Sequence, residues 1–303
     1  MTVNIPKHDI RAPSFWADHD AALYDELAGL TDPAYESLHE NLTAQFVSWL
    51  ASKPPSEVPA NGILVLDAGC GTGKEAVGLL RADPRVHVLG IDVSGPMMDQ
   101  CRRRLERESG DETASGRCVL VQSDVRDSDW LDAAMSRSLP SQWPTSLFAA
   151  VSAYALHHFS PPVKRTIYSD VHRHLRTGGA LVNGDLFSFQ TPWLATYAQT
   201  VEECWIESQM TAAAGSIGQY SVTDPAVWHR LKEQWLCHLR NENCPLPALR
   251  SHAASKSNKA EHSEQHLLAD SGFDAVECTF RCGQSAILWA FKDGDSDERS
   301  KCC

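Results

Sequence analysis

From residue 63 onward the chain alternates between two patterns of apolar positions. Short apolar runs indicate buried strands, and apolar residues at every third or fourth position indicate helices with one buried face. Strands are expected at 63–66, 86–92, 118–122, 147–152 and 180–187, and helices at 74–80, 97–108, 130–139 and from Pro161 to the glycines at 178 and 179. Two final strands are expected at 276–282 and 285–292. The alternation predicts an α/β fold with a doubly wound, mostly parallel sheet of seven strands, one of them antiparallel.

Two further segments have helical spacing but interrupt this alternation. Residues 1–60 are expected to form an N-terminal helical arm that serves as a lid. Its two apolar stripes are Leu23, Leu27 and Leu30, and then Tyr35, Leu38, Leu42, Phe46 and Trp49, followed by Pro54, Pro55 and Pro59. Residues 190–258 are expected to form a helical cap inserted after the fifth strand. Its stripes are Trp193, Tyr197, Val201 and Trp205, and then Trp228, Leu231, Trp235 and Leu239.

The remaining boundaries follow from these two insertions. The core is expected at 61–189 and resumes at 259–292 with a last helix and two strands. The polar tail at 293–303 is expected to be disordered, because it cannot bury enough apolar surface to order itself.

A glycine-rich turn follows the first strand and opens the first core helix. Gly69, Gly71 and Gly73 lie two residues apart and follow Asp67. Glycine allows left-handed backbone dihedrals and lets a ligand approach the chain closely. A dinucleotide fingerprint of the form G-x-G-x-x-G would need a glycine where Lys74 stands, so a dinucleotide oxidoreductase is disfavoured.

Acidic residues follow the second and third predicted strands. Asp92 lies about 20 residues beyond the glycines, where a carboxylate accepts hydrogen bonds from both ribose hydroxyls. Ser94 is expected to cap the helix that starts there. Asp124 follows the third strand, and Asp127 or Asp129 takes its place if the register differs. These positions indicate a nucleoside site.

The order of these motifs resembles the class I S-adenosylmethionine (SAM) dependent methyltransferases, particularly those that act on small molecules. The resemblance covers about residues 60 to 187 and resumes at Gly272-Phe273. It includes the D-x-G-x-G-x-G turn and the strand-end acids, as well as Val151-Ser152-Ala153-Tyr154-Ala155-Leu156-His157-His158 and Leu175-Arg176-Thr177-Gly178-Gly179. The carboxy-SAM synthases share this core.

The resemblance implies SAM as cofactor and assigns a role to each motif residue. Asp67 would hold the glycine loop and, through water, the ammonium of the methionine half. Asp124 would accept from the adenine amino group, and the amide of Val125 would meet a ring nitrogen. Val93, Met97, Ser152 and Tyr24 would complete the cofactor site. Tyr24 and Tyr35 either close over the cofactor or pack in the core.

Candidate catalytic residues follow the fourth strand. His157 and His158 can take a proton near neutral pH, and Tyr154 precedes them. Asn183 or Asp185, near the end of the fifth strand, is expected to contact the acceptor, depending on strand phase. Trp193, Tyr197, Trp205 and Trp228 are expected mainly in the core of the cap, with one or two facing the cationic sulfonium.

Composition and charge limit the partners and the cellular location that can be expected. The 303 residues, 43% of them hydrophobic, allow an ordinary core, and the net charge of -12 disfavours a nucleic-acid partner. No apolar run has the length of a signal peptide or a membrane span, so a cytoplasmic protein is expected. The ten cysteines show no zinc spacing and are expected to be reduced and mostly buried, and no metal is expected. A monomer or a homodimer fits equally.

The sequence therefore predicts a SAM-dependent methyltransferase that acts on a small molecule by direct displacement. One alternative keeps SAM but breaks another bond, as in aminocarboxypropyl transfer, cyclisation to an azetidine with release of methylthioadenosine, or carboxy-SAM synthesis. Another alternative is a SAM-binding module without catalysis.

Overall fold

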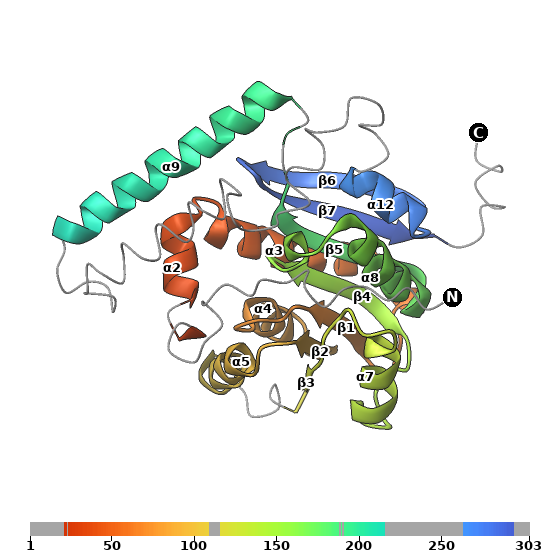
Figure 1. The fold of residues 1–303 in the computed structure, drawn as a ribbon. Coiled ribbons are helices and arrows are strands. Elements are labelled where there is room, and N and C mark those ends of the chain that lie inside the picture. The colour runs from red at the N-terminus through yellow and green to blue at the C-terminus, as the bar shows by residue number, and fades with distance from the viewer. Residues whose placement is uncertain are drawn as a thin grey trace.

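A single twisted sheet of seven strands forms the centre of the protein. The computed structural model describes residues 21–22, 24–108, 116–187, 189, 191–215 and 263–293. The strands are β1 (Ile63–Ala68), β2 (Val86–Asp92), β3 (Cys118–Gln122), β4 (Leu147–Ala153), β5 (Leu175–Leu186), β6 (Ala275–Cys282) and β7 (Ser285–Lys292). Their order across the sheet is β3-β2-β1-β4-β5-β7-β6 (Figure 1). The predicted fold class is confirmed.

The first five strands are parallel, and β7 is antiparallel to both of its neighbours. All six residues of β1 are buried, as expected for a central strand covered on both faces. The parallel strands bring their carboxyl ends to one edge of the sheet, and the strand order reverses direction between β1 and β4. Ligands of doubly wound folds bind at such a switch point.

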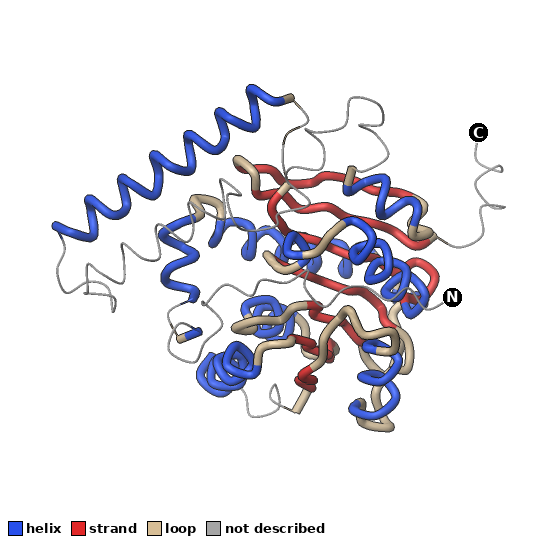
Figure 2. The backbone as a smooth tube through the Cα atoms, in the orientation of Figure 1, coloured by secondary structure: helices blue, strands red, loops and turns tan. Residues whose placement is uncertain are grey.

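Helices cover both faces of the sheet (Figures 1 and 2). They are α2 (Tyr24–Thr31), α3 (Tyr35–Ser52), α4 (Lys74–Ala82), α5 (Gly95–Glu108), α7 (Trp130–Ser138), α8 (Pro161–His174), α9 (Pro192–Gly215) and α12 (Glu264–Asp270), with short 3-10 turns η2 (Pro55–Glu57) and η3 (Leu156–His158). Side chains of α3, α4 and α5 form the apolar core on one face. Those of α7, α8 and α12 form the core on the other. The predicted N-terminal helices thus belong to the same layer as α4.

The boundary between α8 and β5 differs from the prediction. The sequence pattern carried the helix through Leu175 to Gly178, whereas α8 ends at His174 and β5 begins at Leu175. Leu175 pairs with Leu147 of β4, and the register then shifts before Ala149 pairs with Ala180. A buried leucine fits a helix stripe and a strand equally well, and only the pairing with β4 distinguishes the two.

The aromatic stripe of α9 also differs from the prediction. Trp193 and Tyr197 are 66% and 61% exposed rather than buried. The buried residues of α9 are Ala198, Glu202 and Ile206, which lie one position further along the helix. Helix α9 contacts α2, and Glu202 on its buried face accepts hydrogen bonds from Gln284 between β6 and β7. Trp228, Leu23, the polar stretch at 250–262 and the tail from 294 lie outside the described residues.

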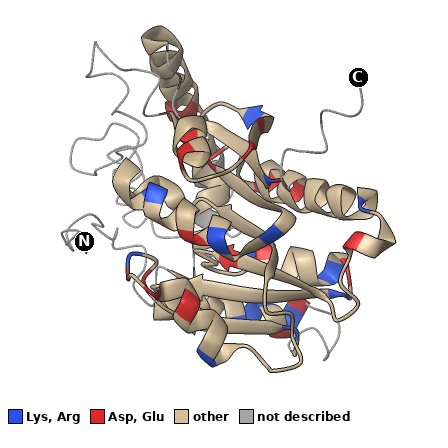
Figure 3. Ribbon diagram, turned by 90° about the vertical axis from the view of Figure 1, so that its right-hand side faces the viewer, with Lys and Arg blue, Asp and Glu red and all other residues tan. Residues whose placement is uncertain are grey.

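Cysteines and charges are distributed without a single dominant patch. The described cysteines are all free thiols, but only Cys70 and Cys101 are buried, while Cys204, Cys278 and Cys282 are exposed. The expectation of mostly buried thiols is therefore wrong for this part of the chain. Acidic and basic residues are both scattered over the described ribbon in this view (Figure 3).

Candidate active site

The glycine loop between β1 and α4 adopts the backbone conformation that only glycine takes easily. Gly69, Gly71 and Gly73 have φ values of 76°, 47° and 83°. A Cβ atom at Gly69 would lie 2.4 Å from the Cβ of Ala155, so the loop approaches the end of β4 closely. At Gly71 the nearest atom would be Cε of Met97 at 3.7 Å, which leaves room beside the backbone. The loop therefore forms a cradle with one open side.

Asp67 lies beneath this cradle at the end of β1. Its side chain is 0% exposed, and neither carboxylate oxygen has a hydrogen-bond partner among the described residues. Burial is the main cause that raises its pKa well above the usual value, followed by the charge of Glu75. A buried carboxyl group without a donor is costly. Its position indicates that a ligand group with N–H donors completes the site.

Asp92 lies at the end of β2 and is oriented by the loop itself. Its Oδ2 accepts from the amide of Gly71 at 2.9 Å, and its Oδ1 accepts from the amide of Ser94 at 2.8 Å. Burial raises the pKa of Asp92, while these backbone donors lower it. The Ser94 hydroxyl accepts from the amide of Met97 at 3.3 Å and caps α5. Val93 is exposed beside this carboxylate.

Asp124 follows β3 and forms an ion pair. Arg126 donates to both of its carboxylate oxygens, with Nε at 2.9 Å from Oδ1 and 3.0 Å from Oδ2. Asp124 is half-buried and Val125 is buried, whereas Asp127 and Asp129 are exposed. Among the three acids weighed from the sequence, Asp124 is thus the one that lies at the sheet edge with an oriented carboxylate.

Ser152 and Tyr154, at the end of β4, use their hydroxyls within the protein. The Ser152 hydroxyl is buried and donates to the carbonyl of Ala68 at 2.8 Å. Tyr154 has a φ of 49°, unusual for a residue other than glycine, and its hydroxyl donates to Ser285 Oγ at 3.2 Å. The Tyr154 hydroxyl is therefore directed toward β7, and only its ring remains available to a ligand.

His157 and Asp185 form a buried pair at the ends of β4 and β5. His157 Nδ1 lies 2.5 Å from Oδ1 of Asp185, and the His157 amide donates to Oδ2 at 2.9 Å. Burial lowers the pKa of His157 to about 3, and the positive charge of Lys164 adds to this effect. The imidazole is therefore neutral at pH 7, with Nδ1–H directed at Asp185 and the lone pair on Nε2. The ring of His158 lies 4.0 Å from that of His157.

Helix α2 lies over the same edge and brings Tyr24 into the site. The pKa of Tyr24 is raised, first by burial and then by nearby acids that include Asp25, Asp185 and Asp92. Its hydroxyl therefore lies among carboxylates from three different elements. The ring of Tyr24 meets that of Tyr35 edge-on, with centroids 6.5 Å apart.

Comparisons with known proteins agree with this geometry. A family described as "Methyltransferase domain" matches residues 65–179. The O-methyltransferase rstn1 of Aspergillus nomiae is 26% identical over 180 residues, which is 57% of this chain and 70% of that protein. An O-methyltransferase family protein from Burkholderia thailandensis shares the fold with a TM-score of 0.54 at 12% identity, over 93% of this chain and 63% of that one. Together with the fold, these findings support a class I SAM-dependent methyltransferase.

A further relative of this methyltransferase catalyses different chemistry on the same cofactor. The carboxy-S-adenosyl-L-methionine synthase of Klebsiella pneumoniae is 24% identical over 128 residues, which is 42% of this chain and 44% of the synthase. The chain thus spans less than half of that relative, and less than two thirds of the Burkholderia structure.

SAM is the cofactor, and the observed residues fit it. The open side of the cradle at Gly71 admits a ligand, and the unpartnered carboxylate of Asp67 matches an ammonium group. Asp92 presents an oriented carboxylate of the kind that binds ribose hydroxyls. No group of His, Cys, Asp and Glu within the described ranges could hold a metal ion.

Sequence reasoning missed three residues of this methyltransferase that the fold brings to the site. Asp25 of α2 accepts from the hydroxyls of Tyr35 and Thr72, each at 2.8 Å, and also pairs with Arg104. His39 of α3 pairs through Nδ1 with the buried Glu75 of α4. The only signals in the sequence were the adjacency of Asp25 to Tyr24 and a charged residue just after the glycines, and neither identifies a partner.

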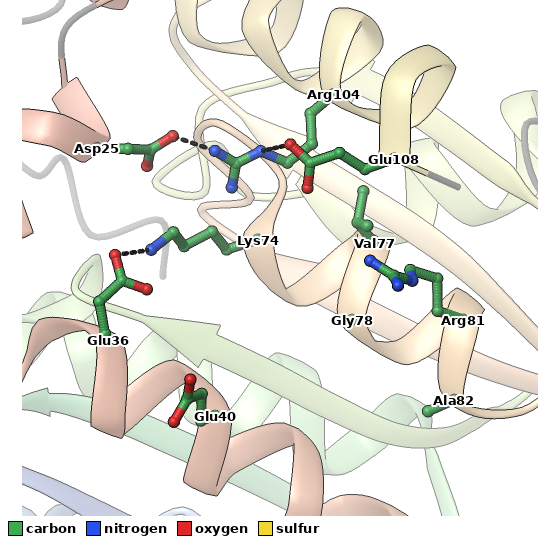
Figure 4. A pocket seen from close by; sticks show the side chains of 10 residues that line it. All are labelled: Asp25, Glu36, Glu40, Lys74, Val77, Gly78, Arg81, Ala82, Arg104 and Glu108. Carbon is green, nitrogen blue, oxygen red and sulfur yellow. Dashed lines mark hydrogen bonds and ion pairs between the residues drawn. The ribbon is translucent and has the colours of Figure 1, made fainter. Parts of the chain in front are cut away.

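An open groove of about 870 Å³ borders the site on its outer side, between α3, α4 and α5. Figure 4 shows Lys74 directed at Glu36 and Arg104 placed between Asp25 and Glu108. Neither Asp67 nor Asp92 lines the groove. The groove is therefore separate from Asp67 and Asp92, and it shares the ion pair of Asp25 and Arg104 with the lid contacts.

Proposed function

We propose that this methyltransferase transfers a methyl group to an oxygen or nitrogen atom of a small molecule by direct displacement. The observation that carries the proposal is the neutral His157 held by Asp185 at the same sheet edge as the glycine cradle. An O-methyltransferase among the relatives supports a hydroxyl acceptor.

When bound, SAM supplies a methyl group on a sulfonium, which an acceptor atom takes by in-line displacement. The cradle and Asp92 fix the donor, and the edge of β4 and β5 fixes the acceptor, so that the reacting atoms are aligned. His157 takes the hydroxyl proton at Nε2 as the methyl group is transferred, and because its pKa of about 3 makes the resting imidazole a weak base, this step depends on the Asp185 carboxylate. Asp185 then stabilises the imidazolium through Nδ1–H. A thiol or a neutral amine reacts without this base.

The test is incubation of the purified protein with SAM and with fractionated small-molecule extracts, followed by mass spectrometry. Formation of S-adenosylhomocysteine together with a product heavier by one methyl group supports the proposal. A variant with Asp92→Ala should form neither, because it binds the donor poorly. S-adenosylhomocysteine formation that requires only macromolecular fractions would contradict a small-molecule acceptor.

Similarity to a carboxy-SAM synthase favours a second candidate, in which SAM is consumed without methyl transfer. The aromatic rings of Tyr24, Tyr35 and Tyr154 surround the same edge and could serve either reaction. Incubation with SAM alone separates the two functions. If methylthioadenosine forms, or if carboxy-SAM forms when a small carboxylic acid is added, the methyltransferase proposal is wrong.

Domain roles, partners and location complete the proposal. We infer that residues 1–60 form the lid, that 61–189 and 259–292 form the core, and that 190–258 set acceptor specificity. The net charge of -12 supports an acceptor other than nucleic acid. None of the described helices is long and apolar enough to cross a membrane. We propose a cytoplasmic enzyme that acts as a monomer or a homodimer.

A further inference from the structure

Two buried polar groups near the cradle have no hydrogen-bond partner among the described residues. One is the carboxylate of Asp67, and the other is Nε2 of His39 on helix α3. Buried polar atoms in folded proteins are almost always paired with protein, water or ligand. The Asp67 carboxylate accepts hydrogen bonds, and a protonated Nε2 of His39 donates one. A ligand that satisfies both groups must therefore carry a donor and an acceptor.

Glu75 connects the two groups. It pairs with Nδ1 of His39, and its charge is the largest electrostatic influence on the pKa of Asp67 after burial. The side chains of His39 and Glu75 are only 11% and 6% exposed. When a carboxylate holds one nitrogen of an imidazole, the direction of the other nitrogen is fixed. His39 is therefore an oriented group rather than a mobile surface side chain.

Two tyrosine rings fix the plane of His39. Its ring centroid lies 4.5 Å from that of Tyr35, edge-on, and 5.6 Å from that of Tyr154. Tyr154 directly follows β4, in which Val151 pairs with Asp67 of β1. The imidazole thus lies on the side of the sheet edge where the methionine half of the cofactor must reach Asp67.

Charge determines which part of the ligand His39 can take. Asp67, Glu75 and Asp92 are acids, and the nearest described cations are engaged elsewhere, Lys74 with Glu36 and Arg104 with Asp25. The ammonium of SAM matches Asp67, and its carboxylate needs donors, of which a side chain that is not already paired is one. Because Glu75 engages Nδ1 of His39, Nε2 is the ring atom left to bind a ligand, and as Nε2–H it donates to a carboxylate.

We propose that His39, oriented by Glu75, donates Nε2–H to the carboxylate of the methionine half of SAM, while Asp67 accepts from its ammonium. Through His39, the N-terminal arm then prefers SAM, which carries a carboxylate on its methionine half, over analogues that lack this carboxylate. The inference rests on SAM binding and does not depend on which acceptor is methylated.

Decarboxylated SAM provides the test, because it keeps the ammonium and the sulfonium but lacks the carboxylate. Affinities for SAM and for decarboxylated SAM are measured by calorimetry without any acceptor, in the unmodified protein and in the His39→Phe variant. The variant should bind SAM about tenfold more weakly and decarboxylated SAM unchanged, as the loss of one charge-assisted hydrogen bond predicts. An exposed histidine provides the matched control, and His266→Phe should leave both affinities unaltered.

Other outcomes overturn the proposal. Equal weakening of both ligands would mean that His39 acts on the ammonium or only on the fold, and unchanged SAM affinity would mean that it contacts no ligand. If His39→Phe does not fold, Glu75→Ala keeps the imidazole but removes its anchor, and it should reduce the preference for SAM in the same way. Failure to find an acceptor affects none of these results, because they are binding measurements.

Discussion

Two acidic residues at the sheet edge, Asp67 and Asp92, differ in whether the protein itself supplies their hydrogen-bond partners. Asp67 and Asp92 both lie at the ends of strands. Only the Asp92 carboxylate accepts hydrogen bonds within the protein, from the amides of Gly71 and Ser94. Asp67 has none among the described residues. Asp92 is thus pre-organised for the ribose, whereas Asp67 depends on the ligand for its partner.

Replacement of Asp92 by asparagine should weaken SAM binding roughly 10- to 100-fold. The variant keeps one oxygen but loses the charge that strengthens hydrogen bonds from ribose hydroxyls. Calorimetric titration with SAM measures the change. Asp99→Asn, an exposed acid paired with Arg102 on the same helix, should bind SAM as the unmodified protein does. Equal affinities in the two variants would exclude Asp92 from the ribose site.

His157 should make the protein less stable as the pH falls below about 6.5. Its folded-state pKa, about 3, lies below the ordinary value near 6.5, so the unfolded chain binds more protons in this window. The stabilisation is complete above pH 6.5 and is lost at a slope that approaches about 1.4 kcal/mol per pH unit.

Denaturant unfolding at pH 7 and pH 5 tests this dependence. His157→Gln should lose less stability than the unmodified protein over that range, because it removes the group that gains a proton. The partly buried His174→Gln is the control and should follow the unmodified protein. An identical pH slope in His157→Gln would show that this histidine is charged in the folded state.

At the scale of elements, helix α2 is attached to the glycine loop through one side chain. Asp25 contacts Tyr35 of α3, Thr72 of the loop and Arg104 of α5. A single carboxylate therefore connects the N-terminal arm to the two elements that flank the cofactor cradle. The attachment explains how a short helix of eight residues keeps its place over the site.

Asp25→Ala should speed the release of SAM by about tenfold, because the lid loses three contacts while the cradle is unchanged. Stopped-flow fluorescence with a competing ligand measures the release rate. Glu36→Gln is the control, since its pair with Lys74 is exposed and contributes little. Similar release rates for both variants would mean that α2 does not gate the site.

Helix α9 is attached to the sheet by a buried carboxyl group. Glu202 accepts from the side-chain amide of Gln284 at 2.7 Å and from its backbone amide at 3.3 Å. Burial is the main cause that raises the pKa of Glu202 to about 7. A raised acid pKa means that the protonated form is favoured in the folded state, so its contribution is complete below about pH 4.5 and is lost as the pH rises through 7.

Glu202→Gln should therefore stabilise the protein at pH 8 by up to roughly 3 kcal/mol and have little effect at pH 5. Thermal unfolding at both pH values measures this difference. Glu203→Gln makes the same chemical change at the neighbouring, half-buried position. This control variant should leave the stability unchanged at both pH 8 and pH 5. A destabilised Glu202→Gln at pH 8 would show that the ionised carboxylate, rather than the protonated acid, attaches α9.

For the whole molecule, cofactor binding should be visible as added stability. A ligand at 100 times its dissociation constant adds about 2.7 kcal/mol, which corresponds to a rise of roughly 4 °C in Tm for a chain of this size. Thermal shift with SAM or S-adenosylhomocysteine should give such a rise, and NAD should give none. A rise with NAD would contradict the cofactor assignment, and the Asp92→Asn variant should show a reduced rise with SAM.

The sequence by itself determined the order of strands and helices, the glycine turn and the positions of Asp67, Asp92 and His157. These features depend on local rules: apolar periodicity, the dihedral freedom of glycine, and the place where a strand ends. Local rules also explain why the predicted end of α8 was wrong. A leucine at position 175 satisfies both the helix and the strand pattern, so the local pattern does not decide between them.

Only the tertiary structure decided which side chains meet. Asp25 and Arg104 are 79 positions apart, His39 and Glu75 are 36 apart, and Glu202 and Gln284 are 82 apart. No local pattern encodes such pairs, because they result from how α2, α3 and α9 pack on the finished sheet. The outward direction of Trp193 and Tyr197 has the same origin. Spacing predicts that a helix has a stripe, but contacts made in the folded protein, such as that of Glu202 with Gln284, decide which face is buried.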